Sequence, residues 1–280
     1  MSDAAAQRPR IVNLWPDGSP HNPRNPMERP RIECYVPSDD GGGSRAVVIV
    51  CPGGGYRMRA PHEATPVARF LAAHGLAAMV CHYRVAPERY PAPMADVARA
   101  VRVARSLAPE WGLDAGRIAL MGFSAGGHAA VTVATRPDLH NDPQDDLAAR
   151  YAARPNRLVL AYPVVSMVED AHEACLLNLF GRDPGLEWRE ALSAERWVSR
   201  ETPPSFLFHT ADDPGVAAGH SLRYAAACRE QGVPVELHLF AHGPHGVGLA
   251  QDDPALARWP HLLLRWLADW LPDDVRRTLA

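Results

Sequence analysis

Short apolar runs alternate along most of the chain with longer segments whose apolar residues recur every three or four positions. The runs have the length of strands buried on both faces, and the longer segments have the spacing of amphipathic helices. The expected strands lie at 31–37, 46–51, 76–83, 117–122, 157–163, 205–211 and 235–241, and the expected helices at 62–75, 92–112, 125–135, 219–232 and 255–271. Strands separated by helices predict an α/β fold, a doubly wound and mostly parallel sheet with helices on both faces.

Three segments depart from this alternation. The first 30 residues are rich in proline, asparagine and arginine, and we expect them to cross the surface without regular helix or strand, because proline fixes φ and removes a donor. Residues 38–44, SDDGGGS, predict a turn. Residues 167–200 contain helix-like sequence, which we interpret as a small helical insert that could cap a pocket. We expect residues 1–280 to form one domain.

The composition is that of a globular protein, with 47% hydrophobic and 22% charged residues. A formal net charge of −3 and the lack of any basic run argue against nucleic acid as a partner. No apolar stretch reaches the ~20 residues of a membrane span, and the first ten residues lack the apolar core of a secretory signal. We therefore predict a cytoplasmic protein that binds neither nucleic acid nor membrane.

One serine lies where an expected strand runs directly into an expected helix, in the sequence LMGFSAGGHAA at 120–130. This context is that of a nucleophile elbow, in which a sharp turn exposes a strained Ser124. Residues two positions away must then lack bulk, and Gly122 and Gly126 meet that requirement. The amide of Ala125, at the positive end of the helix, would face a developing oxyanion.

A serine hydroxyl is a poor nucleophile at neutral pH, so a base and an orienting acid are required. The acid candidates are Asp212 and Asp213, which directly follow the strand expected at 205–211. We favour Asp213, and Asp212 stays open as the alternative. The loop after the last expected strand offers His245 as the favoured base, with His242 as the alternative.

A run of three glycines follows the strand expected at 46–51, in the sequence CPGGGY. Glycines let backbone amides approach an oxyanion closely, and each such donor lowers a barrier by about 2.7–4 kcal/mol. We therefore expect Gly54, Gly55 and Ala125 to form an oxyanion hole. Tyr56 and Trp188 are candidates for substrate contacts at the entrance, although aromatic residues serve equally as core or cap packing.

Metal, cofactor and disulfide sites are not expected. His238, His242 and His245 lie close together in the sequence, but their spacing matches no zinc pattern and no acidic ligand stands beside them. The five cysteines are scattered and include no C-x-x-C pair, so we interpret them as small buried side chains.

The motifs resemble, in order, those of the α/β-hydrolase superfamily and, within it, the bacterial acetylxylan-esterase-like and carboxylesterase group. The similar segments are LWPDGSP, CPGGGY, HYRVAPERYPAPMADVARA, GFSAGGHAA, YPVVSM, TPPSFLFHTADD, GVPVELHLF and HGVGLA. The resemblance implies a serine esterase that hydrolyses short acyl esters, including acetyl groups on sugars, through an acyl-enzyme. It also implies Ser124, Asp213 and His245 as the catalytic triad.

Two positions depart from the pattern of these relatives. Residues 215–221 read GVAAGHS where relatives tend to carry V-P and then an acidic and an amide residue. Pro52 stands where lipase-like relatives carry histidine, which favours the acetyl-esterase-like group. Two other functions stay open: a lipase-like carboxylesterase for longer acyl chains, and a non-catalytic ligand-binding or scaffold protein on a hydrolase fold.

Overall fold

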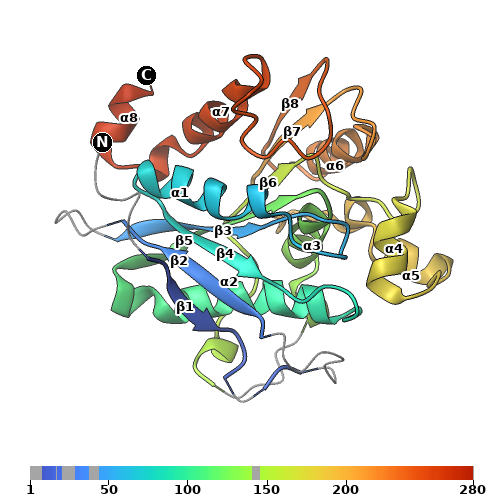
Figure 1. The fold of residues 1–280 in the computed structure, drawn as a ribbon, viewed down its shortest axis with the longest axis horizontal. Helices are drawn as coiled ribbons and strands as arrows, with labels where there is room; N and C mark the ends of the chain where they lie inside the picture. The colour runs from blue at the N-terminus through green and yellow to red at the C-terminus, as the bar shows by residue number, and fades with distance from the viewer. Residues whose placement is uncertain (1–7, 17, 21–28, 38–43, 141–145, 280) are drawn as a thin grey trace.

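An eight-stranded sheet lies at the centre of the structure, a computed structural model that describes residues 8–16, 18–20, 29–37, 44–140 and 146–279 (Figure 1). Its spatial order is β1-β2-β4-β3-β5-β6-β7-β8. Strand β2 pairs antiparallel with β1 and with β4, and all other pairs are parallel. Along the chain, the strands are β1 (Arg10–Asn13), β2 (Arg31–Tyr35), β3 (Arg45–Cys51), β4 (Ala77–His82), β5 (Leu113–Phe123), β6 (Arg157–Ala161), β7 (Ser205–Thr210) and β8 (Val235–Phe240).

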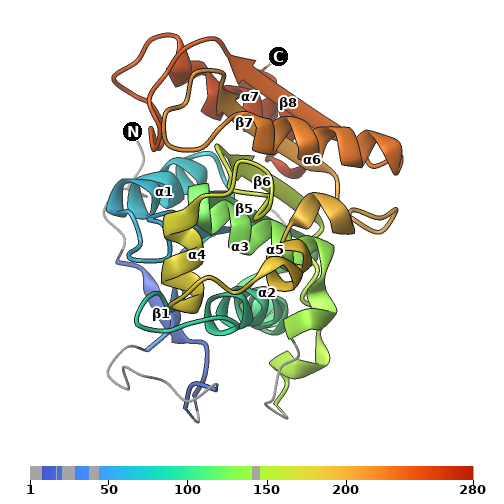
Figure 2. The same cartoon turned by 90° about the vertical axis from the view of Figure 1, so that its right-hand side faces the viewer.

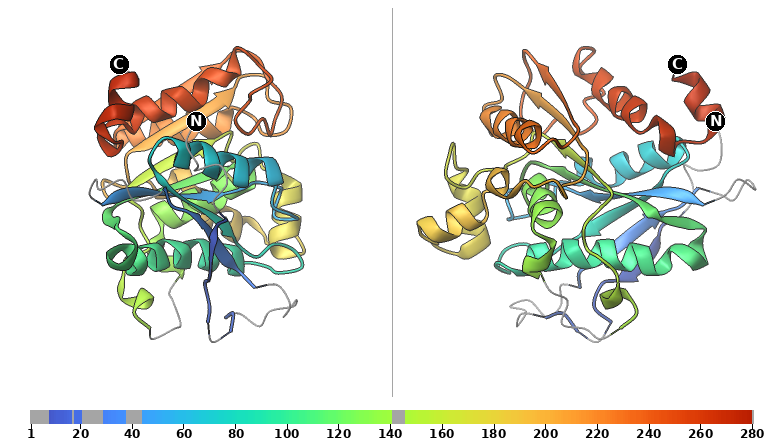
Figure 3. Two further views of the ribbon diagram at one scale, coloured as in Figure 1. Left: turned by 60° about the vertical axis from the view of Figure 1, so that its left-hand side comes forward. Right: turned by 180° about the vertical axis from the view of Figure 1, so that it is seen from behind.

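Helices cover both faces of this sheet (Figures 1 and 3). One face carries α1 (Thr65–Ala73), α7 (Trp259–Trp266) and α8 (Asp273–Thr278). The opposite face carries α2 (Ala92–Trp111), α3 (Ser124–Thr135) and α6 (Gly219–Glu230). The mostly parallel, doubly wound sheet that the alternating sequence predicts is therefore confirmed.

The continuous apolar strands follow from this covering. In β5, Ile118 and Leu120 belong to the core on the side of α2 and α3, whereas Ala119 and Met121 belong to the core on the side of α1 and α7. All four side chains are buried. Because both faces of the strand lie in an apolar core, neither face needs polar residues.

The prediction for the first 30 residues is wrong at one place. Residues 10–13, RIVN, form β1 and pair antiparallel with β2, with Ile11 opposite Glu33. This short segment contains no proline, so it keeps the backbone donors that an edge strand needs. The turn predicted at 38–44 lies outside the described residues, except for Ser44.

The predicted C-terminal helix at 255–271 is also shorter than expected. Its regular part is α7, which has a proline in its first two positions and is flanked by the 3₁₀ turns Leu256–Arg258 and Ala268–Trp270. Proline favours the first helical position, because the amide it lacks would have no partner there. Helix α8 follows as a separate element that the pattern did not predict.

The insert predicted at 167–200 contains α4 (Glu173–Phe180), α5 (Leu186–Ala191) and the 3₁₀ turn Ala194–Trp197. Figure 2 shows α4 and α5 side by side on the face of the molecule turned toward the viewer. Gly181 ends α4 in the left-handed conformation, with a φ of 81° that favours glycine. Among the described helices, none combines the length and the apolar character needed to cross a membrane.

The parallel strands bring distant residues to one end of the sheet. The glycine loop follows β3, Ser124 follows β5, Asp213 follows β7 and His245 follows β8. Because β3, β5, β6, β7 and β8 are parallel, their carboxyl ends point the same way. A site at that end is the usual consequence of this architecture.

Candidate active site

Ser124 lies at a strained turn between β5 and α3. Its backbone φ is 49°, in the left-handed region that a residue with a side chain rarely adopts. A Cβ atom on Gly122 would lie 2.4 Å from the carbonyl oxygen of Gly126, and a Cβ atom on Gly126 would lie 2.2 Å from that of Cys51. Both glycines are therefore required by close backbone contacts, as the sequence predicts for a nucleophile elbow.

Ser124, His245 and Asp213 form a continuous chain of hydrogen bonds. Ser124 Oγ lies 2.9 Å from His245 Nε2, and His245 Nδ1 lies 2.8 Å from Asp213 Oδ2. Because an ionised carboxylate only accepts, Nδ1 carries the hydrogen and Nε2 is left as an acceptor for the serine hydroxyl. The arrangement can therefore move a proton from Ser124 to His245.

Asp213 is held in its ionised form by three hydrogen bonds and by the nearby ring of His209. Its Oδ1 accepts from the amides of Gly215 at 2.8 Å and Val216 at 2.9 Å, and its Oδ2 accepts from His245, with His209 Nε2 at 3.5 Å behind it. Burial by itself raises the pKa of Asp213, but the hydrogen bonds from His209, His245 and Val216 outweigh it and hold that pKa well below its usual range. The carboxylate is thus charged across the neutral range.

The neighbouring Asp212 belongs to a different pair. Its Oδ2 lies 2.8 Å from His242 Nδ1, and its Oδ1 accepts from the amide of Gly243 at 2.9 Å. Both side chains are exposed, and the structure places neither of them against Ser124. The geometry therefore brings Asp213 and His245 to the serine and leaves Asp212 and His242 at the surface.

The histidines near the C-terminus bind separate carboxylates rather than a common centre. His238 Nε2 lies 2.6 Å from Glu236 Oε1, while His242 and His245 contact Asp212 and Asp213. Within the described ranges, no group of three or more histidine, cysteine, aspartate or glutamate residues is arranged to hold a metal ion.

The glycine loop packs directly on Ser124, since a Cβ atom on Gly53 would lie 2.9 Å from the Cβ atom of Ser124. Gly54 and Gly55 have φ values of 123° and 63°, which only glycine adopts readily. In the part of the chain that the structure describes, the amides of Gly54, Gly55 and Ala125 donate no hydrogen bond. They are available to an anion at the N-terminus of α3.

Tyr56 is buried, which favours the packing role that the sequence left open beside the entrance role. Its side chain is buried, and its hydroxyl lies 2.7 Å from His128 Nδ1. His128 Nε2 lies 2.8 Å from the carbonyl oxygen of Leu192, so the neutral ring donates there and accepts from Tyr56. Burial lowers the pKa of His128 to about 4, which keeps the ring neutral. Tyr56 thus ties the glycine loop to α3 and the insert.

The insert contacts the glycine loop through one polar side chain. Asn178, in α4, donates from Nδ2 to the carbonyl oxygen of Gly55 at 2.8 Å. Trp188, in α5, is 42% exposed, and its ring lies 5.2 Å from that of Tyr90 and 6.1 Å from that of Phe180. The candidate Trp188 is therefore open to solvent, on an insert that touches the catalytic end of the sheet.

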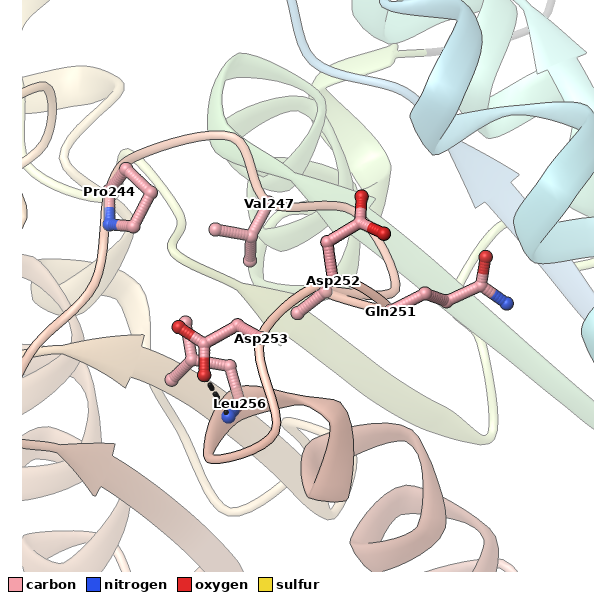
Figure 4. Close-up of a pocket in the computed structure, with 7 residues that line it drawn as sticks. Pro244, Val247, Gln251, Asp252, Asp253 and Leu256 are labelled. Atoms are coloured by element: carbon pink, nitrogen blue, oxygen red, sulfur yellow. Dashed lines mark hydrogen bonds between the residues drawn. The ribbon is translucent and has the colours of Figure 1, made fainter.

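A surface pocket of about 250 Å³ lies beside the loop that carries His245 (Figure 4). Its walls come from Pro244, Val247, Ala250, Gln251, Asp252, Asp253 and Leu256. Asp253 Oδ1 accepts from the amide of Leu256 at 3.1 Å, the contact drawn in Figure 4. Two carboxylates at its wall make this pocket unfavourable for an anionic ligand.

Sequence patterns did not single out Glu63 or Tyr162, which both lie beside the serine and its histidine. Glu63 is only 2% exposed and accepts a hydrogen bond from Gly53, next to the candidate oxyanion donors. The ring of Tyr162 lies 5.1 Å from that of His245. The only available signals were a carboxylate in an apolar helix-like segment and a tyrosine at a strand end, and neither is specific.

A mostly parallel sheet with a strained serine after β5, an acid after β7 and a histidine after β8 defines the α/β-hydrolase fold. The resemblance to acetylxylan-esterase-like and carboxylesterase proteins is confirmed by the comparisons with known proteins. The chain belongs to the BD-FAE family, whose model matches residues 32–227.

Two curated relatives share about a third of their aligned residues with this chain. The endo-1,4-beta-xylanase B of Butyrivibrio fibrisolvens is 31% identical over 248 residues, and the acetylxylan esterase of Xylanibacter ruminicola is 32% identical over 251 residues. Each match covers 86% of this chain, but only 38% of the first relative and 48% of the second. The chain thus spans less than half the length of either protein.

Solved structures match over nearly the whole chain. The acetyl ester-xyloside bifunctional hydrolase from Caldicellulosiruptor lactoaceticus is 40% identical with a TM-score of 0.87, and the match covers 94% of this chain and 96% of that one. A carboxylesterase from Lactobacillus plantarum is 26% identical with a TM-score of 0.76, over 94% of this chain and 98% of that one.

Proposed function

We propose that this protein is a serine esterase that hydrolyses short acyl esters of small molecules, in particular acetyl esters of sugars. The observation that carries the proposal is the hydrogen-bond chain from the strained Ser124 through His245 to the buried Asp213. The similarity to an acetylxylan esterase and to an acetyl ester-xyloside hydrolase supports the acetylated sugar as substrate.

In the first half of the proposed reaction, Ser124 Oγ attacks the ester carbonyl carbon and His245 Nε2 takes the serine proton. The carbonyl oxygen becomes an oxyanion, which accepts hydrogen bonds from the amides of Ala125, Gly54 and Gly55. The C–O bond to the alcohol then breaks, and His245 returns the proton to the leaving alcohol. Asp213 holds the imidazole tautomer and stabilises the imidazolium while it exists.

In the second half, a water molecule takes the place of the alcohol. His245 removes a proton from this water as its oxygen attacks the acyl carbon of the Ser124 ester. A second oxyanion forms at the same amides and collapses, breaking the bond to Ser124 Oγ. The proton held by His245 returns to the serine, and the carboxylic acid leaves.

The test compares the wild-type protein with Ser124→Ala on a nitrophenyl acetate and on a panel of acetylated sugars. Removal of a nucleophile of this kind lowers turnover on the order of 10⁶-fold, while circular dichroism should show an unchanged fold. A fluorophosphonate should label the wild-type protein at Ser124 and leave the variant unlabelled. Absence of both labelling and turnover in the wild-type protein would favour a non-catalytic ligand-binding protein.

Longer acyl esters are a second candidate substrate, favoured by exposed apolar side chains on the insert. Leu177, Leu186 and Trp188 are 52%, 62% and 42% exposed. Apolar surface of this kind could contact an extended acyl chain. A series of acetyl, butyryl and octanoyl esters separates the candidates: kcat/KM falls with chain length for an acetyl esterase and rises for a lipase-like enzyme.

We also propose a cytoplasmic location. All five cysteines are free and buried, which agrees with a compartment that keeps thiols reduced. Fractionation of the producing cells tests this proposal, since recovery from the culture medium would contradict it.

A further inference from the structure

A buried carboxylate lies between the glycine loop and the loop that carries His245. Glu63 ends the 3₁₀ turn Pro61–Glu63 and is 2% exposed. Its Oε2 accepts from the amide of Gly53 at 2.7 Å, and its Oε1 accepts from the hydroxyl of Tyr162 at 2.7 Å. A carboxylate is costly to bury unless its oxygens are bonded, so these two contacts explain how Glu63 is accommodated.

Tyr162 connects this carboxylate to His245. Its φ is 38°, a strained value, and its amide donates to the carbonyl oxygen of Phe208 at 2.6 Å. Its hydroxyl accepts from the amide of Gly248 at 2.9 Å, three residues beyond His245. Its ring packs edge-on against His245, with centroids 5.1 Å apart and planes at 70°. Tyr162 thus contacts both the imidazole and the loop that carries it.

Both of these hydrogen bonds to Glu63 come from donors, the pattern that suits a carboxylate. The hydroxyl of Tyr162 accepts from Gly248, and its own hydrogen points to Glu63. The amide of Gly53 can only donate. Each oxygen of Glu63 therefore accepts one hydrogen bond, one from the glycine loop and one from Tyr162. The exposed His62 lies on the same side, with its Nε2 3.7 Å from Glu63 Oε1.

We propose that Glu63 is a positioning residue of the esterase reaction, which holds the glycine loop with one oxygen and the Tyr162–His245 contact with the other. The inference rests on the proposed esterase function. Gly53 directly precedes the proposed oxyanion donor Gly54, so a shift of Gly53 moves that donor. The same carboxylate adds a negative charge behind Tyr162, on the side of His245 where an imidazolium forms during both half-reactions.

Several groups face His245 from the elements packed against it. Asp213 contacts Nδ1, Ser124 contacts Nε2, and the backbone of Gly215 lies against the ring. Tyr162 packs on the ring, with Glu63 behind it. His62 Nε2 contacts the carbonyl oxygen of Gly246, and the pair of Asp212 and His242 precedes the loop. This set contains two buried carboxyl groups. Asp213 is required to hold the tautomer of His245, whereas Glu63 can be replaced by glutamine without changing a direct contact of His245.

The test compares Glu63→Gln and Tyr162→Phe with the wild-type protein on nitrophenyl acetate, with active sites counted by fluorophosphonate titration. Glu63→Gln keeps the shape of the side chain but removes its charge. We expect kcat to fall by about 10- to 100-fold, the loss typical of a small displacement of a catalytic group, and KM to stay within about twofold of the wild-type value. The acid limb of its kcat/KM profile against pH should move to lower pH, because the protonated imidazole would lack the nearby negative charge that stabilises it in the wild-type protein. Tyr162→Phe keeps the charge, so kcat should fall without movement of the acid limb.

Asp96→Asn is the matched control, because Asp96 is a fully buried carboxylate whose oxygens contact Arg84 and Trp15 and no residue of the proposed triad or oxyanion hole. It should lower the melting temperature and leave kcat per titrated site and the acid limb unchanged. If Glu63→Gln behaves like this control, the positioning role is refuted. If Glu63→Gln does not fold, a wild-type kcat in Tyr162→Phe refutes it instead. A wild-type protein without turnover refutes the proposed function itself.

Discussion

Replacement of Asp213 by asparagine tests the assignment of the acid most directly. The two oxygens of Asp213 have different partners: Oδ1 accepts from the amides of Gly215 and Val216, and Oδ2 accepts from His245 and lies 3.5 Å from His209. Asparagine has one oxygen and one NH₂ group, so it cannot accept at both positions. Retaining the two backbone hydrogen bonds turns the NH₂ group toward His245.

The size of the expected loss of activity follows from the tautomer that His245 would adopt. With an NH₂ group opposite it, Nδ1 of His245 must accept, and the ring hydrogen then lies on Nε2, which faces Ser124. A ring in this state cannot take the serine proton. The equivalent change in a serine protease triad lowers kcat about 10⁴-fold, which corresponds to about 5.4 kcal/mol at about 1.36 kcal/mol for each factor of ten.

The assay is kcat/KM for nitrophenyl acetate hydrolysis, with urea unfolding to confirm that each variant is folded. Asp212→Asn is the matched control, because it removes only the exposed contact with His242 and should keep activity within about twofold of the wild-type value. An Asp213→Asn variant that retains more than about one hundredth of the activity would refute the assignment. A large loss in Asp212→Asn would point to the other carboxylate.

Three further predictions concern stability. Gly126→Ala places a Cβ atom 2.2 Å from a backbone carbonyl oxygen, so the unfolding free energy in urea should fall by about 1–3 kcal/mol with loss of turnover; a variant as stable as wild type would contradict this. Burial lowers the pKa of His128 and of His220 to about 4 in the folded protein. Between about pH 6.5 and 4 the unfolded chain therefore binds more protons than the folded protein does. The unfolding free energy should therefore fall as pH falls through that window, by up to about 3 kcal/mol for each histidine, and equal urea midpoints at pH 7 and 4.5 would refute it. Asp96→Ala leaves the fully buried Arg84 without its carboxylate and should cost about 3–5 kcal/mol in calorimetry, whereas a loss below about 1 kcal/mol would contradict the ion-pair argument.

The sheet and the proposed triad could be predicted because each depends on local sequence. A buried strand followed by G-F-S-A-G indicates a nucleophile elbow, and the order of serine, acid and histidine then follows from the strand ends. Strand β1 was missed because proline-rich sequence on its C-terminal side dominates the pattern, although residues 10–13 themselves contain no proline. The local pattern thus predicts an element well where the element is long and buried.

The supporting residues could not be predicted, because their roles depend on contacts between distant segments. Glu63 and Tyr162 are 99 residues apart in the sequence, and Tyr56 and His128 are 72 residues apart. A lone glutamate in a helix-like segment is usually solvent-exposed, and only the tertiary structure shows that this one is buried. For the same reason, the sequence could not decide between an entrance role and a packing role for Tyr56.

Strand β8 occupies the outer position of the sheet and pairs with β7 alone in the described structure. Its side chains are mostly half-buried or exposed, whereas β5, at the other side of the reaction centre, is buried over most of its length. The nucleophile therefore follows a strand that is buried over most of its length, and the base follows an outer strand that is only partly buried. We expect heat or denaturant to loosen this outer strand first and so to separate the two before the rest of the protein unfolds, with activity lost ahead of global unfolding.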